Sequence, residues 1–289
     1  MKLFFILALA LVCPGFAFAA GDAAALARAI EAAPAGATLK LAAGEYDVAD
    51  LRIPRDLTLI GDGEVILYSS HKLDKGLLVP VNGVSIRIEN ITFRGARSWD
   101  RNGAGVRHEG RDLTIVNCRF IDNEDGVLAT GDENGVIEIV RSEFVGNGYG
   151  DGYSHGIYVS SGARLTISDS RFVGTKYGHH VKSLAGVTVI TGSVFDDANG
   201  HTSYAVDASR GGDVTISGNS FAKAADADNN ALFNYDLTRG GQAQALRITR
   251  NRIVNHYRGA VLLRNKTRLA PMIEDNQITN EDRARMTLE

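Results

Sequence analysis

One short stretch of the chain holds two adjacent histidines and a lysine. It reads GTKYGHHVKSLA and covers residues 174–185. Histidine changes charge near neutral pH and can act as a general base or acid, while a lysine ammonium can neutralise a carboxylate. His179, His180 and Lys182 could therefore move a proton beside an anionic group. The backbone that carries these side chains decides whether they meet, and a repeat in the sequence defines that backbone.

Segments such as LTIVNCRF (113–120), LTISDSRF (165–172) and VTISGNSF (214–221) recur along the chain. Each has an isoleucine five residues before an apolar anchor, and successive anchors are 23 to 32 residues apart. A repeat of this length is typical of a solenoid, in which every repeat stacks on its neighbours. The predicted core anchors are Phe93, Phe120, Phe144, Phe172, Phe195, Phe221, Ile253 and Ile278.

A second column lies two residues before each anchor and changes from apolar to serine to asparagine. Hydrophobic periodicity does not explain short polar side chains at this position. Stacked in successive coils, they can hydrogen-bond along the solenoid axis and satisfy backbone groups. We therefore predict an internal ladder through Ile91, Cys118, Ser142, Ser170, Ser193, Asn219, Asn251 and Asn276.

Each repeat also carries a second short strand with alternating apolar and polar residues, such as GIYV (156–159) and HVKS (180–183). We align these strands on the inward residues Val106, Val127, Ile157, Val181, Val206, Leu232 and Val261. The following residues then point outward: Arg107, Leu128, Tyr158, Lys182, Asp207, Phe233 and Leu262. Lys182 and Asp207 become neighbours about 4.8 Å apart on adjacent coils. The same alternation predicts that His180 points outward beside Lys182.

This alignment gathers polar and aromatic side chains on one face, with His155 and His179 as neighbours where their strands begin. Elimination on a uronate needs a cation near the carboxylate, a base for the C5 proton and a proton donor for the leaving oxygen. Lys182 or Arg210 would be the cation, and His179 or His180 the base. Tyr158 or Tyr235 would donate the proton or stack on a sugar. We predict catalytic roles for Lys182, His179, His180, Arg210 and Tyr158, and substrate binding by His155, Asp207, Asn234, Tyr235 and Tyr153.

Structural interpretations compete with this one. Lys182 and Asp207 could instead form a surface salt bridge, which contributes about 0–1 kcal/mol to stability. His155 and His179 could be a stacked pair at a turn with no role in catalysis. Asp196 and Asp197 lack the partner residues that inverting hydrolases combine with such a pair. Asp226 and Asp228 (226–228) could bind calcium, although two carboxylates in a loop are more often solvated. We expect no cofactor and no metal.

The repeats, the ladder and the second strands resemble the right-handed parallel β-helix, or pectate-lyase-like, superfamily over about residues 21–280. An amphipathic helix at about 22–33, capped by Asp22, is similar to the helix that plugs the open end of such a coil. The resemblance implies an all-β, single-domain right-handed parallel β-helix (solenoid) with an N-terminal capping helix.

More narrowly, GHHVKSLA (178–185) and SYAVDASRGG (203–212) are similar to uncharacterised bacterial secreted β-helix repeat proteins with a GH-x-x-KS element. That group carries no assigned reaction, and the fold hosts lyases, hydrolases, epimerases and non-catalytic binders. We expect action on an acidic, uronate-containing polysaccharide by β-elimination (lyase) or C5 epimerisation. The alternative is a non-catalytic carbohydrate-binding or envelope scaffold or accessory protein.

The first residues have the three parts of a secretory signal: Lys2, an apolar run over 3–12 and the small residues Ala17 and Ala19. We expect residues 1–19 to be a cleaved signal peptide and 20–289 to be one secreted or periplasmic domain. Cleavage would leave Cys118 alone, which excludes an intrachain disulfide. The net charge of −3 argues against a nucleic-acid partner, no other segment predicts a membrane span, and we expect a monomer.

Overall fold

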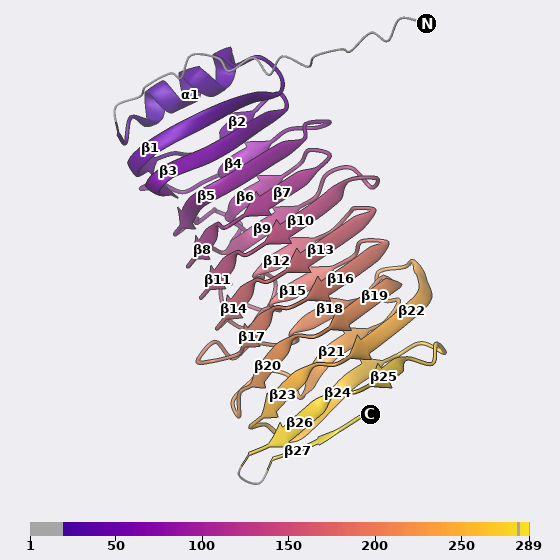
Figure 1. The fold of residues 1–289 in the computed structure, drawn as a ribbon. Coiled ribbons are helices and arrows are strands. Elements are labelled where there is room, and N and C mark those ends of the chain that lie inside the picture. The colour runs from indigo at the N-terminus through magenta and orange to yellow at the C-terminus, as the bar shows by residue number, and fades with distance from the viewer. Residues whose placement is uncertain (1–19, 282–283, 289) are drawn as a thin grey trace, which may run out of the picture.

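The structure is a computed structural model that describes residues 20–281 and 284–288, so the predicted signal peptide lies outside the described residues. The described chain winds as a parallel β-solenoid, and Figure 1 shows its coils stacked from α1 at one end to β27 at the other. Each full coil contributes strands to three stacks, and neighbouring coils pair in parallel. The predicted all-β parallel β-helix is confirmed.

Strands at equivalent positions in successive coils form each stack. The first stack contains β1 (Ala37–Asp47), β3 (Leu57–Tyr68), β5 (Ile86–Arg94), β7 (Leu113–Val116), β10 (Val136–Val140), β13 (Arg164–Ser168), β16 (Val187–Thr191), β19 (Gly211–Ser217), β22 (Gln242–Thr249) and β25 (Met272–Glu274). The second contains β8 (Arg119–Ile121), β11 (Glu143–Val145), β14 (Arg171–Val173), β17 (Val194–Asp196), β20 (Ser220–Lys223), β23 (Arg252–Asn255) and β26 (Gln277–Asn280). β5 bridges the two, because it pairs with both β7 and β8.

The third stack forms a separate sheet and carries the face on which the candidate residues were predicted. It contains β2 (Leu51–Ile53), β4 (Gly76–Pro80), β6 (Ala104–His108), β9 (Asp125–Ala129), β12 (Ile157–Val159), β15 (Val181–Ser183), β18 (Val206–Ala208), β21 (Ala231–Tyr235), β24 (Arg258–Asn265) and β27 (Arg285–Thr287).

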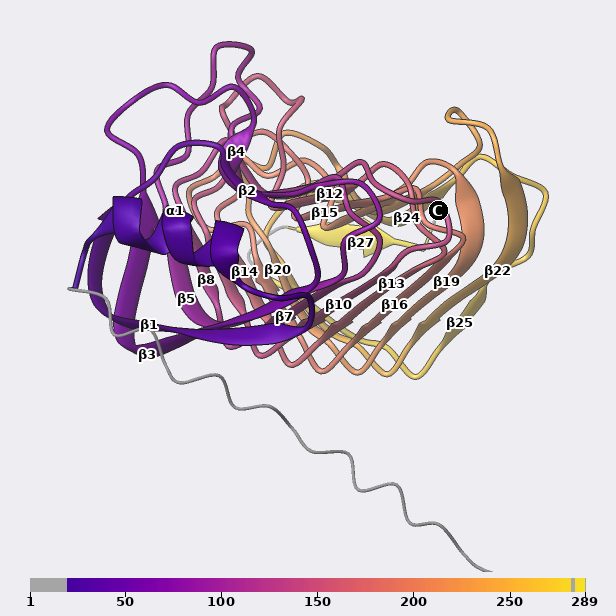
Figure 2. The same cartoon turned by 90° about the horizontal axis from the view of Figure 1, so that it is seen from above.

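A helix closes the first coil, as predicted. α1 (Ala23–Ala32) begins after Asp22, whose Oδ1 accepts a hydrogen bond from the Ala25 N–H at 2.8 Å. Leu26 and Ile30 on one side of the helix are buried in the same core as the strands. Figure 2, the view from above, shows α1 lying across the end of the coil. The helix thereby covers apolar surface that an open solenoid end would expose to water.

Stacked phenylalanines fill the core at the predicted anchor positions. Rings from Phe93 to Phe221 lie nearly parallel, with successive centroids 4.7 to 4.9 Å apart. Ile253 continues the column as a buried residue. The coil spacing of a parallel sheet places equivalent side chains in van der Waals contact, so one aromatic per coil is enough to fill this part of the interior.

The predicted polar ladder is present at the bend between the first and second stacks. Ser142 Oγ accepts a hydrogen bond from the Cys118 N–H at 3.1 Å, and Asn219 Oδ1 accepts one from the Ser193 N–H at 2.9 Å. Asn219 Nδ2 also donates to the Ile190 carbonyl at 3.0 Å. Each serine and asparagine of the ladder thus satisfies a backbone group of the neighbouring coil that the bend leaves unpaired.

The corner where the chain enters the third stack explains a wrong prediction. The residue just before the inward residue of each strand also faces the coil interior. In the early coils this corner residue is glycine: a Cβ at Gly126 would lie 2.8 Å from Phe144 Cδ1 and 2.4 Å from the Gly156 carbonyl oxygen. His180 occupies the same corner two coils later and is completely buried. The prediction that His180 points outward is therefore wrong, because strand alternation begins only at Val181.

The same corner shifts the predicted alignment of the last coils, by one residue in β21 and by two residues in β24. Leu232 and Leu262 are buried corner residues rather than members of the strand columns. Val206 pairs with Phe233, and Phe233 pairs with Leu263. The inward column therefore continues through Phe233 and Leu263, and the outward column through Asn234 and Arg264 instead of the predicted Phe233 and Leu262.

Candidate functional site

The outward column of the third stack brings Tyr158, Lys182 and Asp207 together, as predicted. Lys182 pairs with Tyr158 on one side and with Asp207 on the other. Its Nζ lies 5.2 Å from the centroid of the Tyr158 ring and 3.9 Å from Asp207 Oδ2. A lysine ammonium at this distance from an aromatic face is attracted by the ring. The three side chains form a polar, partly exposed patch on adjacent coils.

Asp207 and Asn234 are also neighbours, through the corrected register. Asn234 Nδ2 donates hydrogen bonds to Asp207 Oδ1 at 2.7 Å and to Asp236 Oδ2 at 3.2 Å. Ser209 Oγ donates to Asp207 Oδ2 at 3.1 Å. Burial raises the pKa of Asp207, although the hydrogen bond from Asn234 and the charge of Lys182 both oppose that rise. Asp207 is thus a largely buried carboxylate that Asn234, Ser209 and Lys182 hold in place.

A second ladder runs along the entrance to the third stack. Asp125 Oδ1 accepts a hydrogen bond from the His155 N–H at 2.7 Å. His155 Nδ1 accepts one from the His179 N–H at 3.0 Å, and His179 Nδ1 accepts one from the Tyr204 N–H at 3.2 Å. The rings of His155 and His179 stack with centroids 4.7 Å apart. The predicted adjacency of the two histidines is confirmed, and Asp125 is a ladder member that the sequence alignment missed.

This ladder settles the protonation of both histidines. Because each Nδ1 accepts a backbone hydrogen bond, the proton of the neutral ring lies on Nε2. Burial lowers the pKa of His179 to about 3 and that of His155 well below its usual value. His179 Nε2 then lies 3.6 Å from Asp207 Oδ2. A neutral imidazole whose lone pair is already engaged cannot accept a substrate proton, so the geometry gives His179 a positioning role.

The pKa values of Lys182 and Tyr158 are shifted in opposite directions. Burial lowers the pKa of Lys182 and raises that of Tyr158. The positive charge of Arg239 lowers the pKa of both groups. Arg239 lies in the loop after β21, where its N–H donates to the Ser209 carbonyl at 2.9 Å. Arg239 could not be predicted from the repeat columns, because this loop belongs to none of them.

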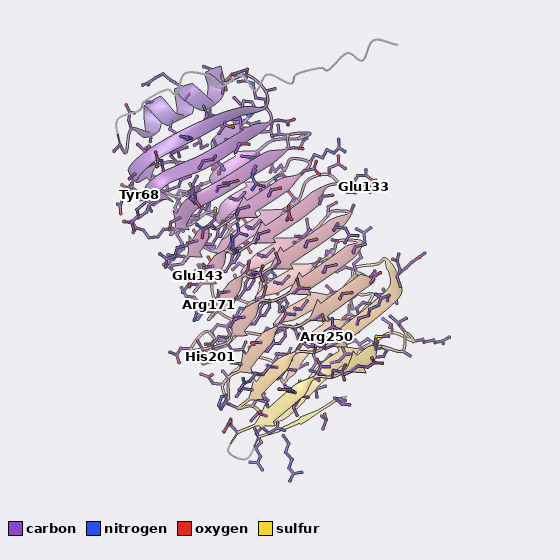
Figure 3. All side chains as sticks on the ribbon, viewed as in Figure 1. Tyr68, Glu133, Glu143, Arg171, His201 and Arg250 are labelled. Atoms are coloured by element: carbon purple, nitrogen blue, oxygen red, sulfur yellow. The ribbon has the colours of Figure 1, made fainter. Side chains whose placement is uncertain are left out.

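Three other predicted site residues lie away from this patch. Tyr235 is buried, and its hydroxyl donates to the Gly212 carbonyl at 2.7 Å, so it cannot stack on a sugar. Arg210 lines a hollow of about 300 Å³ with Glu133 and Gln242. Figure 3 shows Glu133 at the opposite edge of the solenoid from His201. Tyr153 lies in the loop before β12 and is 83% exposed.

His180 belongs to a buried polar cluster inside the coil. Its Nδ1 lies 2.8 Å from Thr175 Oγ1, and its Nε2 lies 3.3 Å from Asp197 Oδ1. The Nζ of the buried Lys223 lies 3.9 Å from Asp197 Oδ2. Neither His180 nor Asp197 has the exposed surface that contact with a polymer requires. The predicted role of His180 as a base is therefore inconsistent with its position.

The acidic loop considered for calcium is open. Asp226 is largely exposed, and its Oδ2 lies 3.5 Å from His201 Nδ1. Within residues 20–281 and 284–288, no group of three or more His, Cys, Asp or Glu side chains is arranged to hold a metal ion. Calcium at Asp226 and Asp228 stays an untested prediction. No helix in the described part of the chain is long and apolar enough to cross a membrane.

Comparison with known proteins fits this architecture. A family model described as the right handed beta helix region matches residues 151–285, which include β12 to β26 and the whole patch of Tyr158, Lys182 and Asp207. The chain is a right-handed parallel β-helix. A search of curated proteins finds no match.

Two solved enzymes share the fold of this β-helix. The alginate lyase from Paenibacillus sp. str. FPU-7 superposes with a TM-score of 0.64 at 17% identity, over 91% of this chain and 95% of that chain. The PL6 family alginate lyase AlyGC superposes with a TM-score of 0.55 at 17% identity, over 93% of this chain. This chain spans 41% of AlyGC. At these identities the similarity shows the fold alone.

Proposed function

We propose that this protein is a polysaccharide lyase that cleaves a uronate-containing polymer by β-elimination at the patch of Tyr158, Lys182 and Asp207, together with Arg239 from the loop after β21. The observation that carries the proposal is the position of Lys182. Its amine lies over the Tyr158 ring and has a lowered pKa on an accessible face of the β-helix. Two alginate lyases with this fold support a polyuronate as the substrate class.

The reaction needs three functions, and the patch supplies each. The Arg239 guanidinium neutralises the uronate carboxylate, which makes the C5 proton easier to remove. Lys182 in its neutral form takes that proton. The electron pair of the C5–H bond becomes the C4–C5 double bond as the C4–O4 bond breaks, and Tyr158 donates its hydroxyl proton to O4. The products are an unsaturated uronate end and a new free hydroxyl.

The pKa directions suit these roles. A lowered pKa increases the neutral fraction of Lys182 at neutral pH, which a general base requires. A raised pKa keeps Tyr158 protonated, which a general acid requires. Asp207 holds the amine within 3.9 Å, and the Nε2–H of His179 faces the same carboxylate. Both are positioning residues, because they act through Lys182.

The first test incubates residues 20–289 with alginate, pectate, glucuronan and glycosaminoglycans. We expect ultraviolet absorbance from unsaturated uronate ends with at least one polymer. Exchange of the C5 proton with deuterated solvent, without chain cleavage, would mean C5 epimerisation by the same base. If neither signal appears with any polymer, the enzyme proposal is wrong, and the same face serves non-catalytic carbohydrate binding.

The second test uses variants of the two proton-transfer residues. Loss of a general acid or base typically lowers the rate 10²- to 10⁴-fold, so we expect Lys182→Met and Tyr158→Phe each to lower kcat about 100-fold or more. Lys266→Met is the matched control, since Lys266 lies on the same face with its Nζ 3.6 Å from Asp236 Oδ2. A full rate in Lys182→Met would overturn the assignment.

A further inference from the structure

Exposed aromatic side chains gather along one edge of the solenoid. They lie in the loops that join the second stack to the third, over residues 95–103, 146–156, 174–180 and 197–205. Trp99 is 77% exposed and Tyr153 is 83% exposed, while Tyr149 and Tyr177 are about two-fifths exposed. Figure 2 shows loops in the purple to rose part of the chain projecting together from this edge. Figure 3 places His201 on it.

The loop that carries Trp99 is anchored by a buried carboxylate. Glu124 is almost completely buried, and its Oε2 accepts hydrogen bonds from the Ser98 N–H at 2.8 Å and the Gly103 N–H at 2.7 Å. These two donors flank Trp99 on both sides. A buried carboxylate is costly unless such bonds satisfy it. The Trp99 indole is therefore exposed to solvent on a loop whose two ends are hydrogen-bonded to the buried Glu124.

Side-chain contacts orient three further rings of this edge, those of Tyr149, Tyr177 and His201. The Arg101 guanidinium lies over the Tyr149 ring, 4.8 Å from its centroid. Tyr177 and His201 stack with centroids 5.1 Å apart and an angle of 21° between their planes. Rings that are already ordered lose little conformational entropy when a ligand packs on them.

The edge continues into the patch of Tyr158 and Lys182. Tyr177 precedes His179 by two residues, and His179 stacks on His155. The ring of Tyr158 meets that of His155 edge-on, with centroids 5.4 Å apart. The loops of Trp99 and His201 are four coils apart, which at the spacing of parallel strands is about 19 Å. That length suits several linked sugar rings rather than a single one.

We infer that Trp99, Tyr149, Tyr153, Tyr177 and His201 form a sugar-stacking strip that binds uronate-polymer residues beyond those at Lys182. The identity of the polymer rests on the proposed function. The apolar C–H face of a pyranose packs on an electron-rich ring, and the polar tip of Tyr or Trp can bond its hydroxyls. Exposed apolar patches on soluble proteins mark such binding surfaces. Arg101 adds a cation that attracts the uronate carboxylate.

The chain offers a direct probe, because Trp99 is its single tryptophan. Fluorescence is measured while the polymer is titrated into Lys182→Met, which we expect to bind the polymer without turnover. We expect the emission of Trp99 to change in intensity or wavelength at saturable polymer concentrations. If Trp99 emission stays unchanged while affinity electrophoresis shows that the polymer is bound, the sugar-stacking role of the strip is wrong.

Variants measure what the strip contributes. We expect Trp99→Ala and Tyr153→Ala to weaken polymer binding about five- to tenfold in affinity electrophoresis. In the active enzyme they should raise KM for the polymer with kcat unchanged. The controls are Val136→Ala and Met272→Ala, which remove side chains that are 43% and 46% exposed elsewhere. Strip variants that bind like the controls would overturn the inference, and Tyr153→Ala keeps the test valid if Trp99→Ala does not fold.

The strip and the lyase can fail separately. Trp99-dependent binding without product from any polymer would support the strip and overturn the lyase. Loss of turnover in Lys182→Met with unaltered polymer binding in the strip variants would support the lyase and overturn the sugar-stacking strip. A neutral glucan retained as strongly as the polyuronates would overturn the uronate specificity of the strip.

Discussion

His155 Nδ1 accepts a hydrogen bond from the backbone N–H of His179 at 3.0 Å, and the two imidazoles stack face to face. His179 repeats the arrangement with Tyr204, and Asp125 begins it by accepting from His155. Each ring therefore accepts a backbone N–H of the next coil, as a carbonyl oxygen would, and stays neutral. Lys182 and Tyr158 donate and accept no hydrogen bond of this ladder, and in the proposed reaction they carry the proton transfer.

The buried ladder predicts a loss of stability in acid. An unfolded histidine binds a proton as the pH falls below about 6.5, whereas folded His179 stays neutral until its pKa of about 3. The unfolded state then holds more protons, so the free energy of unfolding falls with pH. Between pH 6.5 and 4.5 this one group should cost about 2 to 3 kcal/mol. Urea unfolding at the two pH values measures the difference.

The variant His179→Asn tests this assignment. Its Oδ1 can accept the Tyr204 N–H in place of Nδ1, and it does not titrate. We expect the stability difference between pH 6.5 and 4.5 to shrink by about 2 to 3 kcal/mol. The exposed His256→Asn is the control and should leave the difference unchanged. An equal pH dependence in His179→Asn and the parent protein would contradict the ladder.

Asp207 should set the pH dependence of the proposed reaction. Its negative charge raises the pKa of Lys182 against the effect of burial. Asp207→Asn removes that charge, so the pKa of Lys182 falls and more amine is neutral at low pH. We expect the acidic limb of kcat/KM to move to lower pH. The control is Asp213→Asn, whose carboxylate pairs with Arg247 at 2.7 Å on the first stack. A shift to higher pH would exclude Lys182 as the base.

The repeating parts of the fold were predictable from one sequence because equivalent positions in successive coils have the same surroundings and therefore carry similar residues. Phe120, Phe144 and Phe172 occupy one column, and their stacking follows from the parallel register. The serine and asparagine ladder was predictable for the same reason. The pairing of Lys182 with Asp207 followed from the strands themselves, in which alternation holds.

The corners and loops were not predictable in this way. His180 lies one residue before its strand, where the chain turns and two consecutive side chains face inward. In ALFNY (231–235) all five residues are buried, so alternation gave no reason to prefer Phe233 over Leu232. Arg239 lies in a loop without a counterpart in other coils. Asp125 is the first residue of the histidine ladder. Because it is not a histidine, the alignment of similar residues did not include it in that column.

The phenylalanine stack should be sensitive to truncation. Phe172 is buried between Phe144 and Phe195, with centroids 4.7 and 4.8 Å away. Phe172→Ala leaves a cavity in a column that the coil spacing keeps open, and we expect a loss of about 3–5 kcal/mol in the free energy of unfolding. Val194→Ala, at an exposed position, should change it by less than about 0.5 kcal/mol. A near-neutral Phe172→Ala would mean that neighbouring coils collapse into the gap.

The asparagine ladder should be as sensitive, for a polar reason. Asn219 accepts from the Ser193 N–H and donates to the Ile190 carbonyl and to Asn251 Oδ1. Asn219→Ala leaves the Ser193 N–H and the Ile190 carbonyl without partners, at about 1–3 kcal/mol each, so we expect a loss of about 2–6 kcal/mol in the free energy of unfolding with turnover unchanged. Asn134→Ala removes an exposed amide and is the control. Ser170 shows that a serine can accept the neighbouring backbone N–H at this position. Asn219→Ser should therefore be more stable than Asn219→Ala, because its Oγ can accept the Ser193 N–H again. If the two variants are equally stable, the hydrogen bonds donated by Nδ2 provide the stability of the ladder.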